Sequence, residues 1–190
     1  MEVKAVRIVK EPEERKQEIL ETAMRLFYEK GYEKTSITDI AQAIGIAQGL
    51  CYRYFPSKEN LFDSAVDQYA QQLADKLTGG IKADRPLKEL LASIPLVAEN
   101  EESLYYGVLH QQENKKFHDQ LTLKVCEKLL PLVRQLLQQA QDRGELQLAD
   151  VDAAASFCTY GQLGILLNTE GDIAEREQRI RDFLTYALRL

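Results

Sequence analysis

Residues 36–55 read SITDIAQAIGIAQGLCYRYF, and they are the most informative stretch of this chain. Apolar residues recur there at steps of three and four, which predicts a short helix with one inward face made by Ile37, Ile40, Ala41 and Ile44. Ser36 and Asp39 have the spacing of a capping box, with Asp in place of the usual Glu. Gly45 permits a tight turn, and a second short helix is expected over residues 47–54.

Two short helices joined by a glycine turn satisfy the geometry of a helix-turn-helix, whose second helix projects into a groove of DNA. On spacing alone, a simple corner in a helical bundle remains the alternative. The side chains favour DNA, because Gln48 can pair with a base edge or a phosphate. Tyr52, Arg53 and Tyr54 offer donors to phosphate oxygens, and Lys58 stands at the start of the next expected helix.

The remaining periodicity is helical, and we find no convincing strand or internal repeat. Further helices are expected over residues 12–30, 57–77, 84–94, 104–109, 118–142, 150–168 and 172–188. With the two short helices above, the chain is expected to be all-α with nine helices.

The charge is unevenly distributed along the 190 residues. The chain has a formal net charge of -6, which argues against a protein that coats nucleic acid indiscriminately. Residues 1–60 contain ten basic and ten acidic residues, so the whole deficit lies in residues 61–190. A local DNA-reading surface near the start of the chain is therefore compatible with the composition.

Cysteine usage and hydropathy indicate a cytoplasmic protein. Cys51, Cys126 and Cys158 are far apart and form no C-x-x-C pair, so neither a disulfide framework nor a thiolate zinc site is expected. The N-terminus has no apolar core of signal-peptide length. The charge-free run of residues 153–169 is short for a membrane span and contains polar residues, so we expect a buried helix and no membrane contact.

The stretch from Arg15 to Phe62 resembles the TetR/AcrR family of bacterial transcriptional repressors. The residues that carry the resemblance are Ile19, Ala23, Phe27, Gly31, Tyr32, Thr35, Ile40, Ala41, Gly45, Gly49, Tyr52, Tyr54, Phe55, Ser57, Lys58, Glu59 and Leu61. The resemblance implies a homodimer with a nine-helix TetR-like fold. Residues 1–56 would form a three-helix helix-turn-helix domain that binds DNA, and residues 57–190 a helical domain for ligand binding and dimerisation.

The family's DNA contacts carry over to Thr35, Ser36, Thr38, Ala47, Gln48, Gly49, Leu50, Tyr52, Arg53, Tyr54 and Lys58. Two departures from the family pattern matter. Leu50 stands where the family often has a small polar residue, so it either touches a thymine methyl group or turns inward. Cys51 holds the position of a larger apolar core residue, which we interpret as packing and not as a redox sensor.

The two expected C-terminal helices are interpreted as the dimer surface, since one is apolar all round and the other has a strong apolar stripe. The expected interface residues are Phe157, Gly161, Gly164, Ile165, Ile180, Phe183, Leu184 and Leu188. An internal core helix in a monomer is the alternative. A ligand pocket is expected among the middle helices, lined by Tyr69, Tyr105, Tyr106, His110, Gln111, Phe117 and His118.

These features predict a dimeric repressor that binds a palindromic double-stranded DNA operator and is released by a small-molecule effector. The alternative is a helical ligand-binding or adaptor protein that does not touch DNA. No enzyme is expected, because the sequence shows no nucleophile motif and no glycine-rich phosphate loop. No cofactor is expected. His110, Glu113 and His118 have tolerable spacing for a metal, but the run Asn114-Lys115-Lys116 indicates a turn, so no metal site is predicted.

Overall fold

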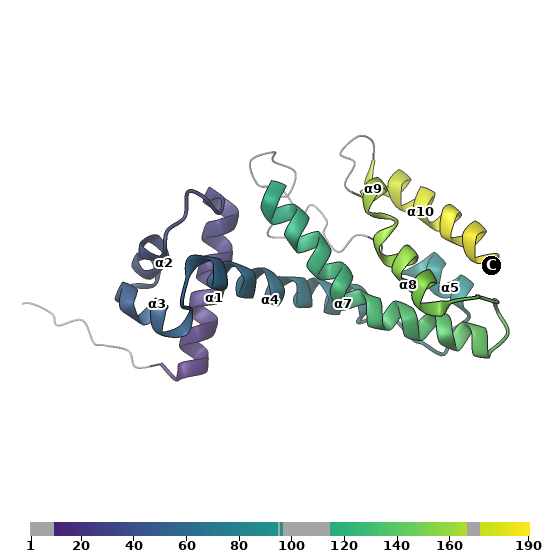
Figure 1. Cartoon of the computed structure of the whole chain (residues 1–190), viewed down its shortest axis with the longest axis horizontal. Coiled ribbons are helices and arrows are strands. Elements are labelled where there is room, and N and C mark those ends of the chain that lie inside the picture. Colours follow the sequence, from purple (N-terminus) through teal and green to yellow (C-terminus); the bar gives the residue numbers. More distant parts are fainter. Residues whose placement is uncertain (1–9, 95, 97–114, 167–171) are drawn as a thin grey trace, which may run out of the picture. The chain divides into compact units, whose positions relative to one another are not determined.

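The computed structural model describes residues 10–94, 96, 115–166 and 172–190, and the described part of the chain is all-α (Figure 1). Its helices are α1 (Pro12–Lys30), α2 (Ile37–Ile44), α3 (Gln48–Tyr54), α4 (Lys58–Thr78), α5 (Leu87–Ser93), α7 (Lys115–Asp142), α8 (Val151–Tyr160), α9 (Leu163–Leu166) and α10 (Ile173–Leu188). The all-α prediction is confirmed, and the expected count of nine helices is approximate. The helix expected over residues 104–109 lies outside the described residues.

The chain divides into two compact units, one up to Val66 and one from Asp67 onward. The division falls within α4. The boundary expected between residues 56 and 57 stays a prediction.

The helix ends of the first unit follow the predicted signals. Ser36 Oγ accepts a hydrogen bond from the Asp39 amide at 3.1 Å, and the Asp39 carboxylate accepts one from the Ser36 amide at 2.8 Å, so the capping box is complete. Gly45 ends α2 at φ 79°, and Gly31 ends α1 at φ 83°, two backbone conformations that favour glycine.

The core of the first unit holds α1, α2 and α3 together. The predicted inward face of α2 is buried except for the half-buried Ile44, and Ile19 and Phe27 of α1 are each 0% exposed. The Phe27 ring meets the Phe62 ring edge to face, with 5.1 Å between centroids, and Tyr32 packs at 4.6 Å from Phe62. Because α2 packs against both α1 and α3, this core fixes the angle at which α3 is presented (Figure 1).

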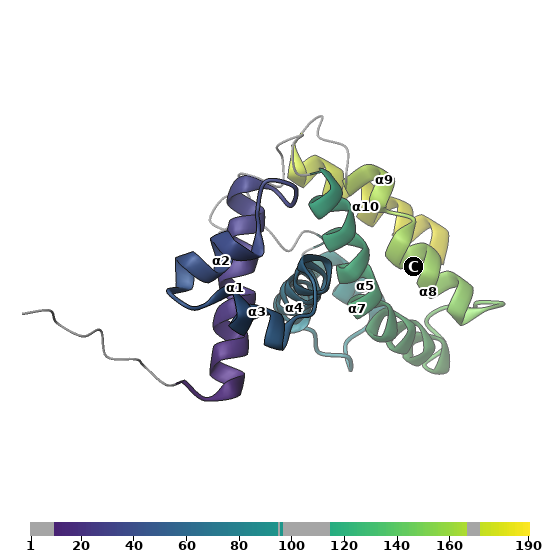
Figure 2. The ribbon, with the colours of Figure 1, turned by 60° about the vertical axis from the view of Figure 1, so that its left-hand side comes forward.

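The second unit is built on the packing of α7 against α8, with α5 and α10 alongside (Figure 2). Its core cluster is aliphatic and consists of Leu87, Leu90, Leu136, Leu137, Ala140, Leu146 and Ala155. The Glu145 carboxylate accepts the free Leu87 amide at 2.7 Å and so caps the start of α5. The ion pair with Arg143 and the hydrogen bond from the Leu87 amide both lower the pKa of the Glu145 carboxyl.

The continuous helix expected over residues 150–168 is interrupted, and this prediction is wrong. α8 ends at Tyr160, and the short α9 begins at Leu163. Gly161 at the break is a weak helix former. Two side chains also donate to the Thr159 carbonyl there, Gln162 Nε2 at 3.3 Å and the Cys126 thiol at 3.7 Å. The sequence shows the glycine but not these donors from α7 and from the chain after the break.

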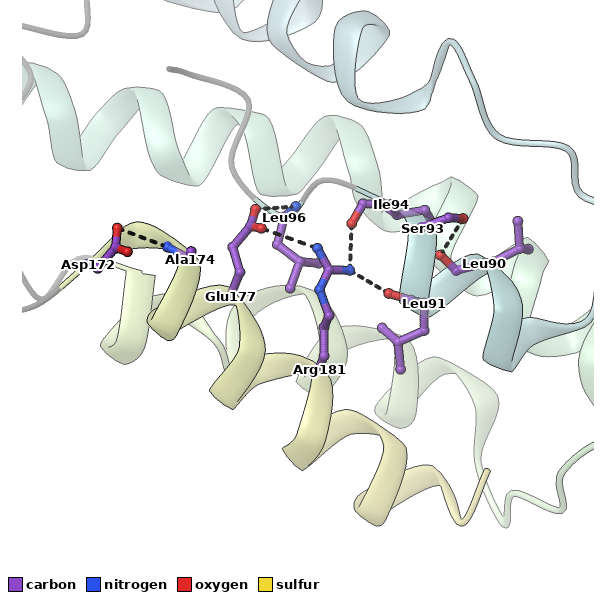
Figure 3. A network of polar contacts seen from close by, with 9 residues as sticks. All are labelled: Leu90, Leu91, Ser93, Ile94, Leu96, Asp172, Ala174, Glu177 and Arg181. Atoms are coloured by element: carbon purple, nitrogen blue, oxygen red, sulfur yellow. Dashed lines mark hydrogen bonds and ion pairs between the residues drawn. The ribbon is translucent and has the colours of Figure 1, made fainter. Parts of the chain in front are cut away.

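A polar network ties α10 to the end of α5 (Figure 3). The Arg181 guanidinium donates to the carbonyls of Leu91 and Ile94, at 2.5 Å and 2.7 Å, and forms an ion pair with Glu177 at 3.2 Å. Glu177 in turn accepts the Leu96 amide at 2.9 Å. The network satisfies the last carbonyls of α5, which have no partner inside their own helix. None of the helices in the described ranges is long and apolar enough to cross a membrane.

Candidate nucleic-acid interface

Helix α3 presents one exposed face and one buried face. Gln48, Gly49 and Arg53 are exposed, and Tyr52 is 46% exposed although it is a large aromatic residue. Tyr54 and Leu50 are half-buried. An exposed helix that carries amide, hydroxyl and guanidinium groups has the donors that base edges and phosphates accept.

The opposite face of α3 is anchored in the core by Cys51 and Phe55, which are 0% and 2% exposed. Burial raises the pKa of the Cys51 thiol, which keeps it protonated and unreactive. The interpretation of Cys51 as a packing residue agrees with this environment. Leu50 is half-buried between the two faces. Its position therefore does not decide whether its side chain contacts a thymine methyl group or turns into the core.

Thr35 does not belong to the exposed surface. Its side chain is 1% exposed, and its hydroxyl donates to the carbonyls of Leu26 at 3.1 Å and Gly31 at 2.8 Å. The expected phosphate contact is therefore wrong for the Thr35 side chain. Its hydroxyl instead locks the connection between α1 and α2 onto the end of α1.

The two other hydroxyls at the start of α2 differ from each other. Ser36 is exposed, but its hydroxyl donates to the Asp39 carboxylate at 2.6 Å within the capping box. That hydrogen bond lowers the pKa of Asp39 and occupies the proton that a phosphate would accept. Thr38 is exposed on the next position, so it is the better placed of the two to meet DNA.

Lys58 lies at the first position of α4 and is held by its neighbours. Its ammonium lies 4.1 Å from the centroid of the Tyr32 ring and donates to the Glu33 carbonyl at 3.5 Å. The side chain is half-buried. These contacts position a cation beside the free amides at the start of α4, as an anion site at a helix N-terminus requires.

The C-terminal helices expose large aromatic side chains. Phe157 on α8 is 78% exposed, and Phe183 and Tyr186 on α10 are 62% and 82% exposed. Gly161 and Gly164 are also exposed, and Ile165 is half-buried. The expected interface residues Phe157 and Phe183 thus lie on the outside, whereas Tyr186 was missed.

The other stripe of α10 faces inward. Ile180 is 1% exposed, so its expected place at a dimer surface is wrong. Leu184 and Leu188 are half-buried and line a cavity of the second unit, and their expected place at a dimer surface stays a prediction. The three residues follow one another at steps of four and form the stripe that packs α10 onto its own unit.

That cavity has a volume of about 140 Å³ and differs from the predicted ligand pocket. Of the predicted residues, Phe117 is buried and Tyr69 and His118 are half-buried, but none of the three lines the cavity. Tyr105, Tyr106, His110 and Gln111 lie outside the described residues. The signal for the cavity is the abundance of leucine on α5, α7 and α10, which sequence reasoning assigns to ordinary core. Glu113 also lies outside the described residues, so the spacing of His110, Glu113 and His118 is not tested.

Comparisons with known proteins agree with the arrangement of α1 to α4. Residues 19–65 match the family model for bacterial regulatory proteins of the tetR family. The uncharacterised HTH-type transcriptional regulator YuxN of Bacillus subtilis (strain 168) is 35% identical over 88 residues, which cover 46% of this chain and 30% of YuxN. The chain therefore aligns with less than half the length of such curated relatives.

Solved structures match over nearly the whole chain. Salmonella enterica GusR superposes with a TM-score of 0.66 at 21% identity, covering 96% of this chain and 99% of GusR. RolR in complex with its ligand resorcinol gives a TM-score of 0.63 at 19% identity, covering 93% of this chain and 88% of RolR. At these identities the likeness shows a shared fold.

The fold and the exposed α3 define a helix-turn-helix protein with a separate C-terminal helical unit. The match of residues 19–65 and the HTH-type relatives support a regulator of the TetR family, as the sequence resemblance implied. Members of this family are DNA-binding regulators and not enzymes, in agreement with the expectation that this chain is not an enzyme.

Proposed function

We propose that this protein is a homodimeric repressor that binds a palindromic DNA operator and leaves it when a small molecule binds the C-terminal unit. The observation that carries the proposal is the exposure of Gln48, Tyr52 and Arg53 on α3 while Cys51 on the same helix is packed in the core. A repressor acts where the chromosome lies, so the proposal includes a cytoplasmic location.

The proposed DNA contacts divide into two kinds. Gln48 and Leu50 face base edges, with Gly49 allowing the backbone to come close. Thr38, Tyr52, Arg53, Tyr54 and Lys58 donate to phosphates, which sets the register of α3 in the major groove. Ala47 has no side-chain donor and contributes only its backbone. We propose that Ser36 lies next to the phosphate backbone but does not donate its hydroxyl to it, because that hydroxyl donates to Asp39.

The proposed dimer forms through α8 and α10. Phe157, Phe183 and Tyr186 leave large aromatic side chains exposed on the outer surface of these two helices, which a second copy of the chain would cover. A two-fold axis would pair this surface with itself and give a four-helix bundle. Two copies of α3 related by a two-fold axis would read two half-sites related by the same axis, so the operator would be a palindrome.

The proposed release by an effector follows from linkage. A ligand dissociates the complex only if it binds the form that does not fit DNA more tightly than the form that does. The cavity of the second unit is the proposed binding site, and Leu77 and Thr78 at the end of α4 contribute to its wall. Because α4 starts at Lys58, a displacement of α4 would also move a proposed phosphate contact. The complex of the structurally similar RolR with resorcinol supports a small-molecule effector.

The proposal is tested by selecting operators from random duplexes and titrating the selected duplex in a mobility-shift assay at several salt concentrations. We expect a palindromic consensus and an affinity that falls steeply as salt rises, because phosphate contacts release counterions. A folded protein that selects no sequence and shows no salt-dependent affinity would instead be a ligand-binding or adaptor protein that does not bind DNA.

A further inference from the structure

The cavity of the C-terminal unit has a chemistry that limits what it can hold. Its described lining is aliphatic, with leucines and isoleucines from α4, α5, α7 and α10 and from the chain after α5. Among the described lining residues, the side chains with heteroatoms are Thr78, Cys158 and Gln162, and none carries a formal charge. A carboxylate or ammonium placed there would lose its hydration without gaining a counter-ion from these residues, which is costly.

The Arg181 cation, which contacts the backbone of this wall, is already committed. Leu91, Ile94 and Leu96 line the cavity, and Arg181 and Glu177 hold the backbone of these same three residues (Figure 3). The Arg181 guanidinium donates to two carbonyls and pairs with Glu177, so a ligand carboxylate would have to compete with three existing acceptors. The network thus argues against an anionic ligand as strongly as the aliphatic lining does.

Gln162 gives the lining an acceptor that has no hydrogen-bond partner among the described residues. Its Nε2 donates to the Thr159 carbonyl at 3.3 Å, while its Oε1 is buried and accepts no hydrogen bond from the described residues. The reverse orientation of the amide would set Oε1 against the Thr159 carbonyl, two acceptors facing each other. Because Oε1 is covered, a ligand donor reaches it only when the amide turns toward the cavity. A buried acceptor without a partner favours that turn, since it gains a hydrogen bond that it lacks.

The volume sets the size of the ligand. An engineered cavity of about 150 Å³ lined by aliphatic and aromatic side chains holds a benzene molecule. The cavity here, at about 140 Å³, is of the same size. We infer that it binds an uncharged, mainly apolar molecule of roughly six to eight non-hydrogen atoms with one hydrogen-bond donor directed at Gln162. The inference names the class of effector in the proposed function and rests on that function only for the consequence at DNA.

The test is calorimetric titration of the full chain, without DNA, with three probes of similar size. Cyclohexanol has the donor, cyclohexanone has the same ring with only an acceptor, and cyclopentanecarboxylate, whose smaller ring keeps it within the inferred size, is anionic at pH 7. We expect cyclohexanol to bind about tenfold more tightly than cyclohexanone, the worth of one hydrogen bond to a buried group. We expect the carboxylate to bind at least about a hundredfold more weakly than cyclohexanol.

Two variants with matched controls locate the binding. Gln162→Met removes the acceptor and should bring cyclohexanol and cyclohexanone within about twofold of each other. Gln178→Met makes the same change on the exposed side of α10 and should keep the preference. Val133→Phe fills the lining from α7 and should abolish binding of cyclohexanol, whereas Leu123→Phe, at an exposed position of α7, should not.

The possible results separate the inference from the proposed function. Equal binding of all three probes, tighter binding of the carboxylate, or no binding of cyclohexanol to the folded chain would overturn the inference. The three titrations use the wild-type chain, so they test the inference even if Gln162→Met fails to fold. If cyclohexanol binds as expected but leaves the selected operator bound in a mobility-shift assay, the inference stands and the proposed release by an effector fails.

Discussion

The ammonium of Lys58 lies 4.1 Å from the centroid of the Tyr32 ring, which joins the first residue of α4 to the turn that follows α1. Tyr32 itself packs against Phe62, so the cation rests on the aromatic cluster of the first unit. A lysine held in this way has less freedom to lose when it meets a phosphate, which makes it a better contact than an extended surface lysine.

Lys58→Met keeps the aliphatic stem and removes the charge. We expect affinity for the selected operator to fall about tenfold and the slope of log affinity against log salt to decrease by about one, since one phosphate contact is lost. Fluorescence anisotropy at four salt concentrations measures both. Loss of the cation–π contact should cost no more than about 1 kcal/mol of stability, so the variant should stay folded. An unchanged salt slope would remove Lys58 from the interface.

Thr35 provides a test of a corrected expectation. Thr35→Val keeps the shape of the side chain but removes the hydroxyl that donates to Leu26 and Gly31, so we expect a loss of about 1–3 kcal/mol in chemical unfolding. Thr35→Ser retains the hydroxyl and should recover most of this loss. Operator affinity of the folded Val variant should remain within about twofold, because the side chain is buried. A large loss of affinity without loss of stability would show that the hydroxyl does reach DNA.

The capping box at α2 gives a pH-dependent prediction. Hydrogen bonds from Ser36 lower the pKa of Asp39 in the folded chain, so this carboxylate stabilises the fold above its unfolded pKa, and the contribution is lost as the pH falls through the folded pKa. In Ser36→Ala, the pKa of Asp39 should rise toward its ordinary value, as followed by NMR titration. The variant should also lose about 1 kcal/mol of stability at pH 7. If the pKa of Asp39 does not move, the side-chain bond does not form in solution.

Introducing negative charge at the exposed aromatic residues of α8 and α10 tests the proposed dimer. Phe157→Glu combined with Phe183→Glu should convert the proposed dimer to a monomer in sedimentation velocity, because two copies of the surface would bring four carboxylates together. Leu123→Glu is the matched control, since Leu123 is also an exposed apolar residue, 50% exposed, but lies on α7. A wild-type chain that sediments as a monomer at micromolar concentration would contradict the proposed dimer.

Local signals in the sequence predicted the first unit well. Ser36, Asp39, Gly31 and Gly45 act within one turn of chain, so their effect on the ends of α1 and α2 is legible without tertiary information. The assignment of Thr35 is wrong because the resemblance to the family's DNA contacts fixes the position of the residue but not the direction in which its hydroxyl points. Its actual acceptors lie nine and four residues earlier, and only the packing of the turn brings them together.

The second unit was harder to predict for a different reason. Helix α10 carries two apolar stripes, one through Ile180, Leu184 and Leu188 and one through Phe183 and Tyr186. Periodicity shows that both exist, but it does not say which one covers the unit's own core and which one stays outside. The sequence predicts a ligand pocket of aromatic, histidine and glutamine residues. The cavity that the structure shows is lined mainly by leucines. Aliphatic side chains leave the same sequence pattern whether they fill a core or surround a cavity.

If the exposed face of α3 reads DNA, removing the guanidinium of Arg53 should weaken binding. Arg53 is exposed on α3, and Arg25 is also an exposed arginine, on α1, where it forms an ion pair with Glu29 at 3.3 Å. The measurement is the affinity of Arg53→Ala and Arg25→Ala for the selected operator by fluorescence anisotropy. We expect a loss of at least about tenfold for Arg53→Ala and a change within about twofold for Arg25→Ala. Equal affinities of Arg53→Ala and the wild-type chain, with both folded, would contradict the proposal that α3 reads DNA.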